Sequence, residues 1–81
     1  MKVTVKFWSY FRNLTECEET SLEVNEGETL GDVHAAVMEK FPKLAEMKNS
    51  TLKAVGVDYQ MDDYVLSNGD EVSLFPPVQG G

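Results

Sequence analysis

The sequence is poor in the residues that build catalytic and metal sites. Its 81 residues include one histidine, His34, and one cysteine, Cys17. A lone cysteine cannot form a disulfide within the chain, no Cys and His residues stand at zinc-ligand spacing, and no glycine-rich phosphate loop precedes a helical pattern. We therefore expect no resident metal. We interpret Cys17 as a surface residue, and His34 as a surface or boundary residue rather than a catalyst.

Positive charge and long apolar runs are also scarce. Seven Lys and Arg residues stand against 14 Asp and Glu, which gives a net charge of -7. Nucleic acids and anionic membranes are bound through basic side chains, so we expect neither as a partner. No stretch is long enough to span a bilayer, and the alternating N-terminal segment lacks the apolar core of a signal peptide. These features predict a cytoplasmic protein with scattered, solvated carboxylates.

The length suits one small domain with little room for an enclosed active site. Apolar residues at alternate positions of residues 3–7 predict a half-buried strand. The polar, acidic residues 13–20 predict a loop or hairpin connection. Leu22 and Val24 alternate with polar neighbours and predict a second strand.

One amphipathic helix is predicted after the second strand. Thr29 is placed as its N-cap, with Asp32 as an acidic capping-box partner three residues on. Pro42 ends it, because the residue before a proline is driven out of helical geometry. The buried stripe comprises Leu30, Val33, Val37 and Phe41. Leu44 and Met47 extend the apolar cover beneath an irregular segment.

The second half of the chain predicts further strands. Val55 and Val57 indicate a third strand, residues 58–63 a short strand or turn, and residues 72–75 a final strand. A hairpin, then one helix, then more strands indicates the α+β class. We predict a mixed sheet with the main helix packed across one face.

The C-terminus has an unusual composition for a chain end. Pro76 and Pro77 offer no N–H donors and hold the backbone extended. Gly80 and Gly81 have no Cβ, so this backbone can enter a narrow channel and the terminal carboxylate can approach another molecule closely. The ordered combination predicts a tail that works inside a partner.

Two apolar side chains flank the prolines. Phe75 faces away from Val72 and Leu74 by alternation, so it belongs either to a second packing face or to a partner surface. Val78 lies beyond the last predicted strand, and we expect it to be exposed.

The segment GDEVSLFPPVQGG, residues 69–81, resembles the C-terminus of the MoaD-type sulfur carriers, the small subunits of molybdopterin synthase. VKFWSYFRNL, residues 5–14, resembles the opening strand of that family, including an arginine at Arg12. The resemblance implies a ubiquitin-like β-grasp domain over residues 1–75 and an extended tail over residues 76–81. Gly56 departs from the pattern, since many members have Asn there.

The resemblance also implies a mechanism. An E1-like adenylating enzyme would use ATP to activate the Gly81 carboxylate, and a sulfurtransferase would convert it to a thiocarboxylate. The tail would then enter the large subunit of molybdopterin synthase and donate sulfur for the dithiolene of molybdopterin. The protein itself would be a non-catalytic sulfur-donor subunit with no stably bound cofactor. The docking residues would be Phe75, Pro76, Pro77, Val78 and Gly80.

Other functions share this tail. A ubiquitin-like modifier would transfer the same activated Gly81 to the lysines of target proteins. A sulfur carrier for thiamin synthesis or tRNA thiolation would deliver the sulfur elsewhere. A small binding module would carry the tail without using it.

Overall fold

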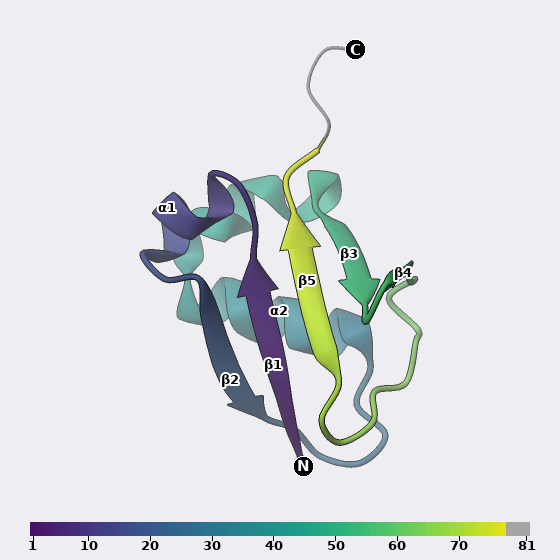
Figure 1. Ribbon diagram of the computed structural model, residues 1–81. Helices are drawn as coiled ribbons and strands as arrows, with labels where there is room; N and C mark the ends of the chain where they lie inside the picture. Colours follow the sequence, from purple (N-terminus) through teal and green to yellow (C-terminus); the bar gives the residue numbers. More distant parts are fainter. Residues whose placement is uncertain (78–81) are drawn as a thin grey trace.

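The structure, a computed structural model, describes residues 1–77 and forms one mixed sheet with a helix across it. The strands lie in the order β2-β1-β5-β3-β4, with β1 and β5 parallel and the other neighbours antiparallel. Figure 1 shows α2 crossing behind the sheet, which confirms the predicted α+β class. The elements are β1 (Lys2–Phe7), α1 (Phe11–Thr15), β2 (Glu19–Glu23), α2 (Leu30–Lys40), the 3-10 helix η1 (Pro42–Ser50), β3 (Leu52–Val55), β4 (Asp58–Tyr59) and β5 (Glu71–Phe75).

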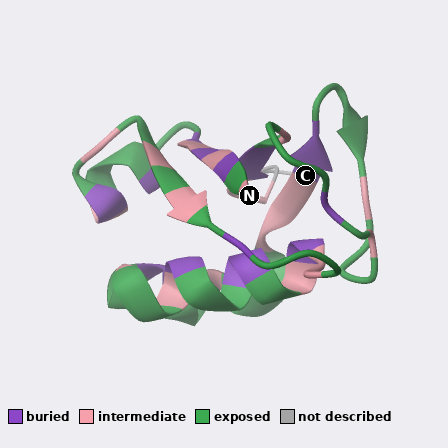
Figure 2. Cartoon of the chain, turned by 90° about the horizontal axis from the view of Figure 1, so that it is seen from below, coloured by how far each residue is buried: buried purple, intermediate pink, exposed green. Residues whose placement is uncertain are grey.

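The core lies between α2 and the inward face of β1 and β5. Figure 2 shows the buried side of α2 turned toward the sheet and its exposed side turned to solvent. Burying each large apolar side chain contributes about 1.5–3 kcal/mol, so this layer holds the fold together. The side chains with at most 2% exposure include Val3, Val5, Phe7, Phe11, Leu30, Val33, Val37, Leu44, Val72 and Leu74.

The ends of α2 follow the predicted signals. The Thr29 hydroxyl oxygen accepts a hydrogen bond from the Asp32 amide at 3.3 Å, and the Asp32 carboxylate accepts one from the Thr29 amide at 2.9 Å. This reciprocal pair satisfies two backbone donors at the start of the helix. The helix ends before Pro42, and the Phe41 ring then packs edge-on against Phe7 at 5.4 Å. No helix within residues 1–77 is long and apolar enough to cross a membrane.

The loop or hairpin connection expected over residues 13–20 is confirmed only in part. The chain does connect the antiparallel strands β1 and β2, but residues 13–15 belong to α1 and residues 19–20 to β2. The chain forms α1 there because Phe11 is fully buried and pulls this segment onto the core. The Thr15 hydroxyl donates to the Phe11 carbonyl at 3.1 Å and to the Cys17 carbonyl at 3.0 Å, which closes the turn after α1. Cys17 is half-buried against the core rather than a surface residue, and this also corrects the prediction.

The predicted third strand extends too far. β3 ends at Val55, and Val57 is 97% exposed in the turn that follows. Gly56 has a φ of +62°, a left-handed conformation that few residues other than Gly and Asn adopt readily. Glycine here and the asparagine usual in the resembled family therefore suit the same turn.

Two other elements differ in extent from the prediction. β2 begins at Glu19 and ends at Glu23, so Val24 is buried just beyond the strand rather than inside it. The segment after α2 is the 3-10 helix η1 instead of irregular chain, and it buries Leu44 beneath it.

His34 is a core residue, with only 4% of its surface exposed, which corrects its interpretation as a surface or boundary residue. It lies four residues after Leu30 and three before Val37, on the buried stripe of α2. Burial, together with the positive charges of Lys53 and Lys48, lowers the pKa of His34 to about 4 against the opposing effect of Asp62. His34 is therefore neutral at pH 7.

Acidification is expected to destabilise the protein through His34. The unfolded chain takes up the proton near pH 6.5 while the folded chain resists until about pH 4, so the unfolding free energy falls as pH decreases through that window. The loss reaches at most about 3 kcal/mol. Urea unfolding at several pH values will measure it, with His34→Gln as the comparison. If the unfolding free energy of the two proteins depended on pH in the same way, a lowered pKa of His34 would be contradicted.

Candidate functional site

The last residue before the tail, Phe75, has its side chain on the sheet face opposite α2. The pairing of β1 with β5 places Phe7 beside Leu74 on the core side, so Trp8 and Phe75 point to the other side. α2 and η1 both lie behind the sheet in Figure 1, and neither covers this second face. We call it the open face.

Three aromatic side chains meet on the open face at the end of β5. The indole of Trp8 stacks on the ring of Phe75, with 5.6 Å between centroids and 14° between planes. Tyr59 meets Phe75 edge-on at 6.2 Å. Trp8 and Tyr59 remain 42% and 69% exposed, whereas Phe75 between them is half-buried. This aromatic cluster (Trp8, Tyr59, Phe75) is both a second packing group and an apolar surface open to a partner.

The cluster fixes where the tail leaves the domain. The Trp8 amide donates a hydrogen bond to the Leu74 carbonyl at 3.2 Å, which joins the residue after β1 to the end of β5. Pro76 and Pro77 follow directly, half-buried and without N–H groups, so neither residue can extend the ladder. The other predicted tail residues, Val78, Gly80 and Gly81, lie outside the described residues.

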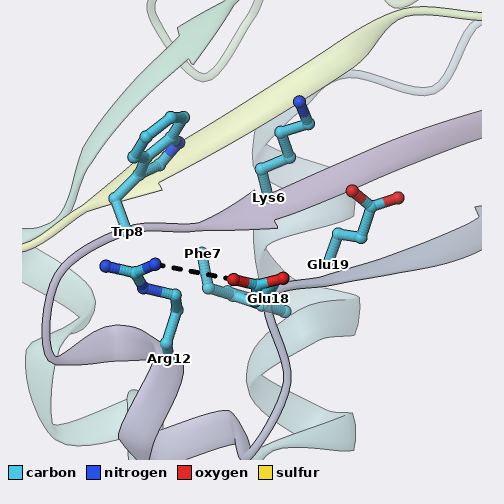
Figure 3. Close-up of a pocket in the computed structure, with 6 residues that line it drawn as sticks. All are labelled: Lys6, Phe7, Trp8, Arg12, Glu18 and Glu19. Carbon is cyan, nitrogen blue, oxygen red and sulfur yellow. Dashed lines mark ion pairs between the residues drawn. The ribbon is translucent and has the colours of Figure 1, made fainter.

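A small hollow adjoins the cluster between β1, α1 and the start of β2. Figure 3 shows its lining, with the Arg12 guanidinium beside the Glu18 carboxylate at 3.7 Å. Its volume is about 190 Å³, below the roughly 300–1,000 Å³ usual for small-molecule sites. The hollow therefore has room for about one side chain and not for a ligand of nucleotide size.

Titratable groups suited to catalysis do not gather on the open face. His34 is buried on the opposite side of the sheet and is neutral at pH 7. No group of three or more His, Cys, Asp or Glu residues within residues 1–77 could hold a metal ion. What this face does offer within the described residues is the aromatic cluster and the charged side chains beside it.

Trp8 and Tyr59 were missed by sequence reasoning. Trp8 follows the alternation of Val3, Val5 and Phe7, so its outward direction could have been found from the same pattern. Tyr59 could not, because its place beside Phe75 depends on the tight turn at Gly56 and on the β3–β4 register.

Comparison with known proteins agrees with this architecture. The model of the ThiS family matches residues 5–81. The chain belongs to the ThiS family. A relative from Mycobacterium tuberculosis, named molybdopterin synthase sulfur carrier subunit, is 31% identical over 100% of this chain and 99% of its own. A relative of the same name from Arabidopsis thaliana is 26% identical and covers 100% of this chain and 84% of its own.

Solved structures place this ThiS-family chain among ubiquitin-like β-grasp proteins. SAMP1 from Haloferax volcanii matches with a TM-score of 0.90 and 20% identity over 100% of both chains, which confirms the predicted fold. A chain from the complex of subunits 1 and 2 of the Helicobacter pylori molybdopterin-converting factor matches with a TM-score of 0.71 and 26% identity over 100% of both chains.

The aromatic cluster can be tested through Trp8, the single tryptophan of this ThiS-family protein. Phe75→Ala is expected to shift its emission to the red and to increase quenching by acrylamide, because the stacked ring no longer shields the indole. Tyr59→Ala is the matched control, since Tyr59 contacts Phe75 rather than Trp8. Equal spectra for Phe75→Ala and the wild type would refute the stack.

Proposed function

We propose that this protein is the sulfur-carrier small subunit of a molybdopterin synthase. The observation that carries the proposal is similarity along the whole of this chain to subunits of that name, combined with a β5 strand that ends at Phe75 and is followed directly by Pro76 and Pro77. Phe75 on the open face and the two prolines that begin the tail lie at the same end of β5, as a carrier that delivers its C-terminus requires.

The reacting group is the Gly81 carboxylate. A carboxylate is a poor acyl donor, because its leaving group would be oxide. An E1-like adenylating enzyme with bound ATP would let this carboxylate attack the α-phosphate, which releases pyrophosphate and forms an acyl-adenylate. Sulfur delivered as a persulfide by a sulfurtransferase would then displace AMP and form an acyl disulfide between Gly81 and the sulfurtransferase. A second thiol would reduce this disulfide, which releases the thiocarboxylate on Gly81 and leaves the two thiols joined as a disulfide.

Docking falls to the aromatic cluster and the tail. Phe75 supplies a large apolar surface at the point of departure, and aromatic anchors of this kind dominate binding energies at protein interfaces. Pro76 and Pro77 reduce the entropy lost when the tail is threaded into a partner. Val78 would add an apolar contact, and Gly80 would let the backbone pass through a narrow channel.

The receiving partner would be the large subunit of molybdopterin synthase. Support comes from the similarity to a chain of the Helicobacter pylori complex of subunits 1 and 2. The large subunit would bind the pterin substrate and supply the acid and base groups for its conversion. ATP belongs to the adenylating enzyme, so this chain needs no cofactor of its own.

The second candidate is a ubiquitin-like protein modifier joined to lysines through Gly81. Its support is the structural similarity to the small archaeal modifier protein of Haloferax volcanii, at 19% identity. The two functions share the adenylation step and differ in the acceptor, a pterin or a lysine amine.

Deletion of Gly81 is expected to abolish thiocarboxylate formation. The chain would then end at Gly80, and its terminal carboxylate would stop one residue short of the adenylation site. Intact-protein mass spectrometry after incubation with the adenylating enzyme, ATP and the sulfurtransferase will measure the product. The matched control is Glu46→Gln, an exposed change on η1. A truncated protein that still acquires sulfur and delivers it would refute the proposal.

Phe75→Ala is expected to weaken binding to the large subunit at least tenfold, or about 1.4 kcal/mol, because it removes the centre of the aromatic cluster. Isothermal titration calorimetry will measure the affinity. Val65→Ala removes a similarly apolar but remote side chain and should leave affinity unchanged. Equal affinities for the two variants would exclude the aromatic cluster from the interface.

A further inference from the structure

The β2 edge of the sheet is an unpaired strand. β2 is the terminal strand on one side of the sheet, and β1 pairs with its other edge (Figure 1). At the ends of this ladder the Phe7 amide donates to the Glu18 carbonyl and the Val24 amide donates to the Met1 carbonyl. Alternate residues of an antiparallel edge strand point their backbone groups to opposite sides. Residues 19, 21 and 23 therefore point theirs away from β1.

These outward groups form a regular template. Outside the strand ladders, no backbone hydrogen bond within residues 1–77 involves Glu19, Ser21 or Glu23. Three N–H groups and three C=O groups thus lie in one row at every second residue, which is the pattern needed to receive an additional strand.

The charges on the open face indicate the chemistry of that strand. Lys6 pairs with Glu71 of β5 at 3.3 Å on one side and lies opposite Glu19 of β2 on the other. Lys2 lies opposite Glu23, at 3.9 Å. The row that contains Lys6 and the row that contains Lys2 each end on a glutamate at the free edge. Because opposite charges on neighbouring strands attract, the next strand would carry a basic residue in each row.

The other side of β2 selects apolar residues. Thr20 and Leu22 point toward the helix layer and are half-buried. The Lys40 ammonium donates to the Thr20 hydroxyl at 3.0 Å, so positive charge is already present on that side. An apolar side chain would extend the cover over Leu22, whereas a basic one would be repelled by Lys40.

A second copy of this chain is a poor occupant. An antiparallel pair of β2 edges centred on Ser21 would place Glu19 of one copy opposite Glu23 of the other, twice. Like charges directly opposite one another destabilise a strand pair. The edge therefore disfavours pairing with itself.

We propose that the β2 edge binds an extended segment of another protein with the pattern basic–apolar–any–apolar–basic. The basic residues would lie opposite Glu19 and Glu23, the apolar residues opposite Thr20 and Leu22, and the central residue opposite Ser21. The pattern reads the same in both directions, so it suits a parallel or an antiparallel added strand. This docking edge is separated from the tail by β1 and β5, so it would remain available while the tail is engaged.

The test uses the full chain labelled with ¹⁵N and the capped peptide GKVSVKG. Amide resonances of Glu19, Ser21 and Glu23 are expected to shift and their hydrogen exchange to slow on binding. The scrambled peptide GKKSVVG has the same composition without the alternation, and it is expected to bind at least tenfold more weakly. An absence of shifts at millimolar GKVSVKG, or equal binding of both peptides, would overturn the proposal.

Variants distinguish binding at the β2 edge from attraction of the basic peptide to the net negative charge of the protein. Glu19→Lys with Glu23→Lys is expected to weaken peptide binding at least tenfold, whereas Glu39→Lys with Glu46→Lys changes the net charge equally on exposed helical sites and should not. Ser21→Pro removes an outward N–H without breaking the β1 ladder and should also abolish binding. Equal losses of peptide affinity in the two double variants would refute the proposal. Amide shifts in β2 that change with protein concentration and not with added peptide would also refute it.

Discussion

The parallel pairing of β1 with β5 is the constraint on which the rest of the structure depends. It joins the first strand of the chain to the last and places both at the centre of the sheet. On the helix side the pairing builds the core from residues such as Phe7 and Leu74. On the other side it brings Trp8 against Phe75, so the same register that stabilises the domain also fixes the point from which the tail departs.

This arrangement explains how so small a chain can serve in a demanding reaction. Within residues 1–77 the open face offers apolar and charged contacts but no metal cluster, and the histidine is buried and neutral at pH 7. A domain of this size buries a modest fraction of its surface, so it has little room to enclose a substrate beside its core. In the proposed function, activation, sulfur supply and pterin chemistry therefore belong to partners, and the carrier contributes a reactive terminus on a rigid base.

The sequence predicted the elements whose signals are local. The alternation in β1, the capping box at Thr29 and the stop at Pro42 each depend on neighbouring residues, and the structure confirms them. Features set by tertiary contacts were missed. α1 forms because Phe11 reaches the core, Val57 is exposed because Gly56 turns the chain, and Tyr59 joins Phe75 only through the β3–β4 register. His34 was misread although its helical spacing placed it on the buried stripe. The site roles of the tail residues stay predictions.

The central claim is that the C-terminus delivers sulfur to a synthase and is not itself joined to the lysines of other proteins. The most direct measurement is purification of the protein from its own cells with an N-terminal tag and a free Gly81, followed by mass spectrometry of the protein and its companions. The account predicts a molybdopterin synthase large subunit in the eluate and a fraction of the carrier with sulfur in place of one terminal oxygen. Many unrelated proteins joined through lysine to Gly81, without thiocarboxylate or a large subunit, would contradict it.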